Sequence, residues 1–327
     1  MRKRECLETF ISLIYFDRKY AYKIKKPVNL GFLDFSTLEK RRFYCIQEYS
    51  LNKRLCEDMY VGVVPVRSLG RFPRFSGVGT PVDYAVKMKR FPQNRLMANL
   101  LKKNMVSQND IVEISRIVSN FHTIAETSDD ICRCGGISAV KFNWDENFAQ
   151  ASKFRGSLID ADSYDMIKSS IEAFIPANKE LFDERIRLHR IKWCHGDLHS
   201  GNIFILRGCT GTMRRIYIFN CIEFNTRFAW LDVASDVAFL AMDLDYYRKK
   251  RFSRIFVDSY VSFSRDKGIL PLLNFYKCYH AFVKSKISLM RLEENSLNGS
   301  LNADEEAKVK NDAQSYFELA KSYALKL

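Results

Sequence analysis

The 327-residue sequence has no cysteines at the C-x-x-C spacing, although it contains nine cysteines. A chain of this length can bury a core without disulfides, and an odd number of scattered thiols is typical of a reducing compartment. We therefore expect reduced cysteines and a cytoplasmic location. Any apolar run near the roughly 18 residues of a membrane-spanning helix is also missing, so no membrane insertion is expected.

Two phosphate-binding signatures are missing as well. The sequence contains no G-x-x-x-x-G-K-[ST] motif, which excludes a P-loop kinase domain within these residues. There is also no glycine-rich turn between the first two expected strands, where Asp17, Arg18 and Lys19 stand instead. If the chain binds phosphate, we expect Lys23 and a metal ion to hold it, with Arg18 or Lys19 as a further contributor.

Acidic residues are in deficit. Aspartate and glutamate number 38 against 52 lysines and arginines, which gives a formal net charge of +14. This balance favours an anionic partner, such as a nucleotide, a nucleic acid or a membrane surface, over a polycation. A solvated basic surface gives the same balance, so charge alone does not identify the partner.

The residue pattern changes along the chain. Residues 11–16 and 20–25 flank a short polar turn and predict a β-hairpin, because β-branched and aromatic residues favour strands. Residues 36–60 predict a helix capped by Ser36 or Thr37, and residues 61–66 and 83–91 predict two more strands.

From Asn94 onward helical periodicity dominates, with two short strands expected at 202–206 and 214–219. We therefore predict an α+β fold with two lobes. Residues 1–92 form a small β-rich lobe, and residues 93–327 form a large, mostly helical lobe.

The segment WCHGDLHSGNIFIL, residues 193–206, carries the clearest chemical signal. His195, Asp197 and Asn202 have the H-x-D-x-x-x-x-N spacing of a kinase catalytic loop, in which the carboxylate meets the substrate hydroxyl and the amide oxygen binds a metal ion. The alternative is that these side chains only form turns with nearby backbone groups.

Two upstream residues fit the same chemistry. Lys23 lies in the second expected strand and Glu48 in the helix that follows, in the order of a phosphate-binding lysine and the acid that orients it. Lys25 is an alternative to Lys23, because residues two apart share a strand face. Taken singly, each is equally explained as an exposed charged residue.

The segment HGDLHSGNI resembles the HGDLHPGNI signature of the aminoglycoside phosphotransferase and choline kinase superfamily, which has a kinase-like fold. AYKIKKPVNLGFLDFSTLEKR and CIEFNTRFAWLDVASDVAFLAMDL are similar to a largely uncharacterised bacterial branch of aminoglycoside phosphotransferase-like proteins. This resemblance covers most of the chain. In some members of the branch a P-loop kinase domain follows, and we expect this chain to be the single-module form.

The resemblance implies a role for each matching residue and implies ATP and Mg²⁺ as cofactors. Lys23 would contact phosphate and Glu48 would orient it. The matching residues of the motif and of the next helix are Asp197 as the catalytic carboxylate, Asn202 as a magnesium ligand, His195 as a brace of the loop, and Asp236 as the acid that anchors the loop.

The strand DYAVKMKRF resembles the one that leads into the hinge of these kinases. Met88, Arg90 and Phe91 would then border the adenine ring. Ordinary core packing is the alternative for these three residues.

The sequence departs from the family pattern at Asn220. The family has a second metal-binding aspartate in a context like IDCIEF, where this chain reads IFNCIEF. Because Mg²⁺ prefers charged oxygen ligands, an amide at this metal position should lower metal affinity sharply. Three interpretations remain open: an inactive protein that still binds nucleotide, a slow enzyme that recruits Glu223, or a variant whose parent has aspartate at 220.

The acceptor is harder to infer. A late expected helix carries His280 and Lys284 four residues apart, on one face, where close relatives in the branch carry arginines. These residues could bind an anionic acceptor, although a solvated helix face explains them equally well. Aminoglycosides are polycations, so antibiotic resistance is not the expected activity.

Three classes of function follow. The first is an ATP-dependent phosphotransferase that moves the γ-phosphoryl group to a hydroxyl of an unidentified small molecule. The second is a kinase-fold protein that binds a nucleotide or metabolite without turnover, as Asn220 suggests. The third, nucleic-acid binding, depends on the net charge and on stretches such as YYRKKRF without a recognised module, and it is not the expected function.

Overall fold

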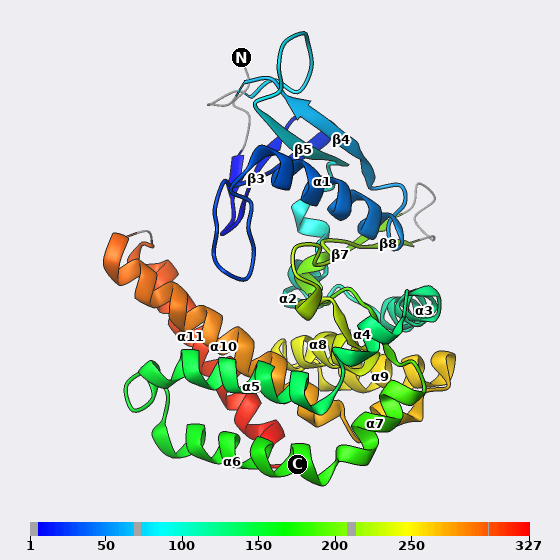
Figure 1. Cartoon of the computed structure of the whole chain (residues 1–327), viewed down its shortest axis with the longest axis vertical. Helices are drawn as coiled ribbons and strands as arrows, with labels where there is room; N and C mark the ends of the chain where they lie inside the picture. Colours follow the sequence, from blue (N-terminus) through cyan, green and yellow to red (C-terminus); the bar gives the residue numbers. More distant parts are fainter. Residues whose placement is uncertain (1–5, 69–72, 208–213, 300) are drawn as a thin grey trace. The chain divides into compact units, whose positions relative to one another are not determined.

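The computed structural model describes the chain except residues 1–5, 69–72, 208–213 and 300. The chain forms two compact units (Figure 1): unit 1 comprises residues 1–110 and 195–229, and unit 2 comprises residues 111–194 and 230–327. The α+β class is confirmed, because a five-stranded antiparallel sheet is joined to a helix-rich remainder. The expected lobes, 1–92 and 93–327, stay a prediction; by compactness, the segment with the H-x-D motif groups with the N-terminal sheet.

The sheet of unit 1 has the strand order β1-β2-β3-β5-β4. The predicted hairpin is confirmed, since β2 pairs with β3 and Phe16 lies opposite Ala21. Its turn needs no glycine because Asp17 Oδ1 accepts hydrogen bonds from the backbone N–H groups of Lys19 and Tyr20, both at 2.7 Å. The strands are β1 Cys6–Glu8, β2 Ser12–Phe16, β3 Tyr20–Lys25, β4 Tyr60–Val66 and β5 Asp83–Lys89.

Helix α1, Leu38–Lys53, packs against this sheet (Figure 1). Of the two predicted caps, Thr37 is the one used, because its side chain accepts a hydrogen bond from Lys40 N at 3.2 Å. Buried Cys45 joins Val86 and Met88 in one hydrophobic cluster between helix and sheet. The helix ends seven residues before the predicted end, Tyr60, which instead begins β4.

The rest of unit 1 holds the motif segment and a second hairpin. Strands β7 and β8 pair antiparallel with Ile203 opposite Ile218, as the sequence predicts. The 3₁₀ turn η3 immediately precedes β7, so the motif is fixed to the start of a strand. The remaining elements of unit 1 are η1 Gln93–Arg95, α2 Met97–Lys102, η3 Ser200–Asn202, β7 Ile203–Arg207, β8 Arg214–Ile218 and η4 Thr226–Phe228.

Unit 2 is mainly helical, with α10 and α11 lying side by side as an antiparallel pair (Figure 1). Its one described sheet pairs two short strands, β6 and β9, which the sequence did not predict. Helix α3 begins at the end of unit 1. The elements are α3 Gln108–Ile124, α4 Asp129–Arg133, α5 Ile137–Ala151, η2 Ser152–Phe154, α6 Ala161–Ala177, α7 Lys179–Arg187, β6 Ile191–Trp193, β9 Trp230–Asp232, α8 Val233–Tyr246, α9 Lys250–Ser264, η5 Lys267–Ile269, α10 Leu273–Asn298 and α11 Ala303–Ala324.

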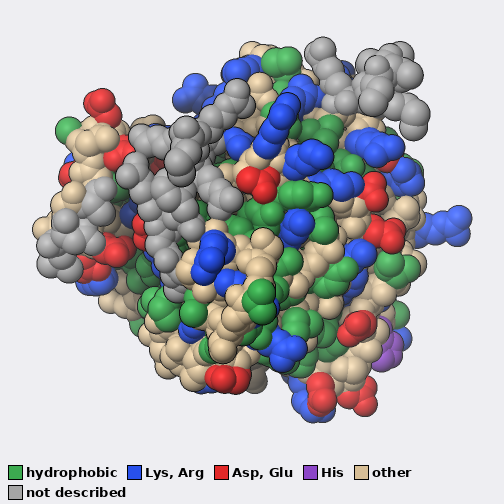
Figure 2. Space-filling model, turned by 90° about the horizontal axis from the view of Figure 1, so that it is seen from above, with side chains coloured by type: hydrophobic (Ala, Val, Ile, Leu, Met, Phe, Trp, Pro, Cys, Tyr) green, Lys and Arg blue, Asp and Glu red, His purple; other side chains and the backbone are tan. Residues whose placement is uncertain are grey.

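Charged residues divide between buried pairs and the surface. In unit 2 the guanidinium of buried Arg185 binds Asp232 and Asp266 at 2.6 and 2.7 Å, so a cation is neutralised inside the core. On the face that Figure 2 shows, lysine and arginine side chains are spread among hydrophobic and acidic ones. Among the described residues, no helix combines the length and the apolarity that crossing a bilayer requires.

Candidate active site

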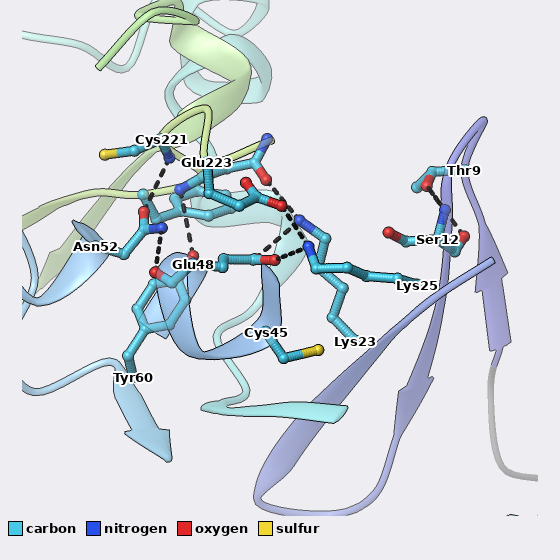
Figure 3. A network of polar contacts seen from close by, with 12 residues as sticks. Thr9, Ser12, Lys23, Lys25, Cys45, Glu48, Asn52, Tyr60, Cys221 and Glu223 are labelled. Atoms are coloured by element: carbon cyan, nitrogen blue, oxygen red, sulfur yellow. Dashed lines mark hydrogen bonds and ion pairs between the residues drawn. The ribbon is translucent and has the colours of Figure 1, made fainter. Parts of the chain in front are cut away.

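Two lysines of β3 meet one glutamate of α1. Lys23 and Lys25 lie two residues apart on one face of the strand, and both point toward Glu48 (Figure 3). Lys23 Nζ donates to Glu48 Oε1 and Lys25 Nζ to Glu48 Oε2, each at 2.9 Å. The structure therefore brings together the lysine and acid that the sequence predicted, together with the alternative lysine.

Burial and charge set the protonation of this group. Burial alone would raise the pKa of Glu48, but the two lysines together lower it to about 2. Burial opposes the charge of Lys25 as well, yet Glu223 and Glu48 raise its pKa above the ordinary value. Glu223 is itself an ion-pair partner of Lys25, and burial raises its pKa. The site thus holds two ammonium groups and two carboxyl groups in a nearly dry interior.

The two lysines differ in what they can reach. The side chain of Lys25 is 1% exposed and lies between two carboxylates, with its ammonium 4.9 Å from the centroid of the Phe35 ring. The side chain of Lys23 is 12% exposed and also donates to Asn220 Oδ1 at 2.9 Å. The geometry favours Lys23 as the lysine that could meet a ligand and Lys25 as an internal ion pair.

The motif segment is held by a histidine in a defined tautomer. Asp197 N donates to His195 Nδ1 at 3.1 Å, so the ring proton is on Nε2, which donates to Phe219 O at 2.9 Å. Gly196 has φ +80°, and a Cβ there would lie 2.3 Å from Phe228 O. Glycine is therefore required beside the brace.

Asp197 is oriented by its own loop. Asn202 Nδ2 donates to the backbone oxygen and to Oδ2 of Asp197, both at 2.9 Å. His199 Nδ1 accepts from Gly201 N at 3.1 Å, so its Nε2 carries the proton and faces Asp197 Oδ2 at 3.3 Å. His199 was not assigned a role from the sequence, although it stands inside the motif and its position was the available signal.

Asn220 follows β8 with φ +68°, a left-handed conformation that asparagine tolerates better than most residues. Its backbone N–H donates to the hydroxyl of buried Tyr60 at 3.3 Å, and the next N–H, of Cys221, donates to Asn52 Oδ1 at 2.9 Å. Asn52 also donates to Glu48 O at 2.8 Å (Figure 3). Asn52 was missed from the sequence, although a polar residue four positions after Glu48 on the same helix face was a signal.

The side-chain amide of Asn220 connects the two halves of the site. Its Oδ1 accepts from Lys23, and its Nδ2 donates to Asn202 Oδ1 at 3.3 Å. Contacts therefore run without a break from Glu48 through Lys23, Asn220 and Asn202 to Asp197. The structure brings together all five residues that were predicted for phosphate, metal and catalysis.

These side chains do not fit the magnesium ions that the fold family implies. Mg²⁺ requires oxygen ligands, preferably carboxylates, in near-octahedral geometry. Here Asn202 Oδ1 already accepts an N–H of Asn220, and Asn220 Oδ1 lies 2.9 Å from an ammonium. Glu223 cannot be recruited as it stands, because its carboxylate is 3% exposed and pairs with Lys25.

The residues expected to border adenine are engaged in packing. Met88 is 6% exposed in the core between α1 and the sheet. Arg90 donates to Asp17 O at 2.9 Å, and the Phe91 ring centroid lies 4.8 Å from that of Tyr217. These contacts agree with the packing alternative, and the adenine role of Met88, Arg90 and Phe91 stays a prediction.

Asp236 lies in unit 2, at the start of α8. Its Oδ2 lies 3.2 Å from His122 Nε2, and His122 Nδ1 lies 2.8 Å from the Tyr260 hydroxyl. Cys194 belongs to the same buried group, since one ligand atom each of His122, Cys194 and Asp236 lie within 4.8 Å of one another. Hydrogen bonds account for this cluster, and the loop-anchoring role of Asp236 stays a prediction.

The predicted acceptor residues also lie in unit 2, on α10. His280 is 5% exposed, stacks on Phe239 with ring centroids 4.0 Å apart, and bonds Ser235 through Nε2. Lys284 is half-buried with its ammonium 5.1 Å from the Phe239 ring. This packing accounts for His280 without a bound substrate. Its role in binding the phosphoryl acceptor stays a prediction that these contacts do not support.

Comparison with known proteins gives relatives of unassigned function. No family model matches the chain. Uncharacterised proteins of Mycobacterium tuberculosis and Mycobacterium bovis are 28% identical over 296 residues, which are 90% of this chain. The chain spans 57% of the length of these curated relatives.

Solved structures resemble the chain over nearly its whole length. A choline/ethanolamine kinase family protein from Mesorhizobium loti matches with a TM-score of 0.52 at 10% identity, covering 99% of this chain and 92% of that one. A protein from Ralstonia eutropha assigned to the aminoglycoside phosphotransferases matches with a TM-score of 0.54 at 11% identity and the same coverage. The chain therefore has the α+β kinase-like fold of these two proteins.

Proposed function

We propose that this chain binds ATP and transfers its γ-phosphoryl group to a hydroxyl of a small molecule. The observation that carries the proposal is the continuous set of contacts from Glu48 and Lys23 through Asn220 and Asn202 to Asp197. It unites a cation suited to phosphate with a carboxylate suited to a hydroxyl in one compact unit. The kinase-like fold supports the same class of reaction.

Each residue has a distinct task in this proposal. Lys23 binds the phosphate chain as a point charge, and Glu48 keeps its ammonium in place. Asp197 accepts the hydrogen bond of the acceptor hydroxyl and orients it for in-line attack, while His195 holds the loop that carries Asp197. Positioning and charge neutralisation supply the catalysis, since phosphoryl transfer needs no covalent intermediate with the protein.

Lys23→Met tests the nucleotide half of the proposal. Loss of a charge-assisted hydrogen bond to phosphate should weaken ATP affinity by about tenfold or more, measured by titration calorimetry. Glu48 keeps Lys25 as a partner in this variant, so the fold should survive. Lys102→Met, at an exposed lysine of α2 in the same unit, is the control and should leave the affinity unchanged. Equal affinities of all three proteins would remove Lys23 from the site.

Asp197→Asn tests the transfer half. The amide is nearly isosteric but cannot accept the proton of a hydroxyl, so phosphate transfer to an acceptor should fall while ATP binding persists. The measurement is transfer of labelled phosphate from ATP to a panel of small hydroxyl compounds. Transfer that persists at the wild-type rate in Asp197→Asn would contradict the assigned role.

A second candidate function is nucleotide binding without turnover, and Asn220 is the observation that favours it. The amide removes one negative charge from a position where the implied chemistry uses two metal ions. Transfer by Asn220→Asp but not by the wild type would favour this second candidate. Transfer by neither protein, with every acceptor tried, would leave binding as the better-supported function.

A further inference from the structure

A series of hydrogen bonds connects Lys23 to Asp197 through Asn220 and Asn202. In each of them the residue nearer Lys23 is the donor and the residue nearer Asp197 is the acceptor. An ammonium group has only donors, so Asn220 must turn Oδ1 toward Lys23 and therefore Nδ2 toward Asn202. A carboxylate has only acceptors, so Asn202 must turn Nδ2 toward Asp197 and Oδ1 toward Asn220. The two amides meet as donor and acceptor, and each orientation is fixed by a charged end.

An aspartate at position 220 could not complete this series of hydrogen bonds, because it has no N–H to donate to Asn202 Oδ1. Its carboxylate would accept from Lys23 but would offer a second oxygen to Asn202 Oδ1, so two acceptors would face each other. Such a pair is unfavourable unless a cation or another donor lies between the oxygens, because an uncompensated acceptor pair in a partly buried site is costly. In this chain an N–H of the Asn220 side-chain amide already donates to Asn202 Oδ1, where the second oxygen of an aspartate would otherwise stand.

We propose that the Asn220 amide replaces a divalent cation in this chain, so that nucleotide binding here does not require a metal ion. The inference rests on the proposed nucleotide site but goes further, because it assigns the cationic contact with the phosphates to Lys23 rather than to Mg²⁺. It names the ligand of the site as the metal-free nucleoside triphosphate.

The charge of the surrounding residues supports this inference. Lys23 and Lys25 already pair with Glu48 and Glu223, so these four side chains leave no excess of positive charge to offset a further acid. An acid at position 220 would add a negative charge beside incoming phosphates. An amide avoids that repulsion while keeping the contact to Lys23.

The first experiment compares nucleotide affinity with and without metal. A non-hydrolysable ATP analogue is titrated into the full chain by calorimetry, once with excess Mg²⁺ and once with EDTA. We expect affinities that agree within about threefold. Affinity lower by about tenfold or more in EDTA would overturn the inference and leave the proposed function standing, whereas binding in neither buffer would contradict the proposed function itself.

The second experiment reverses the substitution. Asn220→Asp should bind the analogue about tenfold or more weakly in EDTA than in Mg²⁺, since the added acid now needs a cation. Mg²⁺ alone, without nucleotide, should raise the melting temperature of Asn220→Asp but not that of the wild type. A metal-independent Asn220→Asp protein would contradict the role given to the amide.

Asn104→Asp is the matched control. Asn104 is an exposed asparagine of unit 1 with φ +54°, so this variant adds the same charge in a similar backbone conformation at a residue outside the contacts that join Glu48 to Asp197. It should behave as the wild type in both buffers. If Asn220→Asp does not fold, the wild-type comparison in Mg²⁺ and EDTA still decides the inference.

Discussion

Lys25 is the side chain on which the buried charges of unit 1 depend most. Its ammonium is shared by Glu48 and Glu223, whose side chains are 0% and 3% exposed. Buried ion pairs contribute little net stability, but removing one partner leaves an uncompensated charge in a medium of low polarity. Lys25 and Lys23 therefore differ although they share a strand face: Lys25 compensates two buried carboxylates, and Lys23 is the lysine proposed to contact a ligand.

We predict that Lys25→Met lowers the free energy of unfolding by about 3–5 kcal/mol, measured by urea denaturation. Adding Glu223→Gln to this variant should restore a large part of the loss, because an amide needs no buried cation. Lys26→Met is the control, since Lys26 pairs with exposed Glu8 and should cost at most about 1 kcal/mol. A loss no greater than that of the control would show that the pair is not buried in solution.

The lowered pKa of Glu48 makes the free energy of unfolding depend on pH. The pKa of Glu48 is lowered to about 2 from an ordinary value of 4.5, so its ion pairs contribute fully above pH 4.5. That contribution, of the order of 3 kcal/mol, is lost as the pH falls from about 4.5 to about 2. We predict that Glu48→Gln is less stable than the wild type at pH 7 and that the difference shrinks at pH 3, by urea denaturation at both. A difference that stays constant with pH would contradict the lowered pKa.

Helix α1 carries Glu48 and Asn52, so its N-terminal cap supports the site from a distance. Thr37→Ala removes the hydrogen bond to Lys40 N and should cost about 1 kcal/mol of unfolding free energy. Ser36→Ala is the control, because the Ser36 hydroxyl bonds Asp34 outside the helix and the residue is exposed. Equal losses from the two variants would mean that Thr37 does not act as the cap.

Secondary structure was largely predictable from periodicity and caps. The β2–β3 hairpin, α1, β4, β5, β7 and β8 follow from alternation and from cap residues. Strands β1, β6 and β9 were missed because three residues are too few to establish a period. The early end of α1 was missed because residues 54–60 keep an apolar spacing while folding into a turn and a strand.

The residues of the site were predictable by type and order, but their contacts were not. The sequence placed Lys23 before Glu48 and Asp197 before Asn202, yet it could not show that Lys25 shares Glu48 or that Glu223 is its partner. Lys25 is 23 positions from Glu48 and 198 positions from Glu223 in the sequence, so only tertiary packing determines these contacts. The same limit applies to His280. Its place on a helix with lysines predicted either an acceptor site or a solvated face, but the side chain is buried.

The charge of the whole chain bears on the class of acceptor. A net charge of +14, spread over lysine and arginine side chains such as those in Figure 2, produces a positive field around the molecule. The field attracts nucleotides and anionic acceptors and repels polycations. Salt should screen this attraction, since the Debye length falls to about 8 Å at physiological ionic strength.

We therefore predict that aminoglycosides are not acceptors, although the fold is shared with proteins that carry their name. Kanamycin at about 1 mM should neither raise the melting temperature nor receive phosphate from ATP, because each ammonium group it brings is repelled by the positive field. The comparison is an uncharged or anionic hydroxyl compound, such as a sugar or a sugar acid, in the same assay at low and high salt. Stabilisation of the chain by kanamycin, strengthened rather than weakened at low salt, would show that a local acidic surface outweighs the charge of the whole molecule.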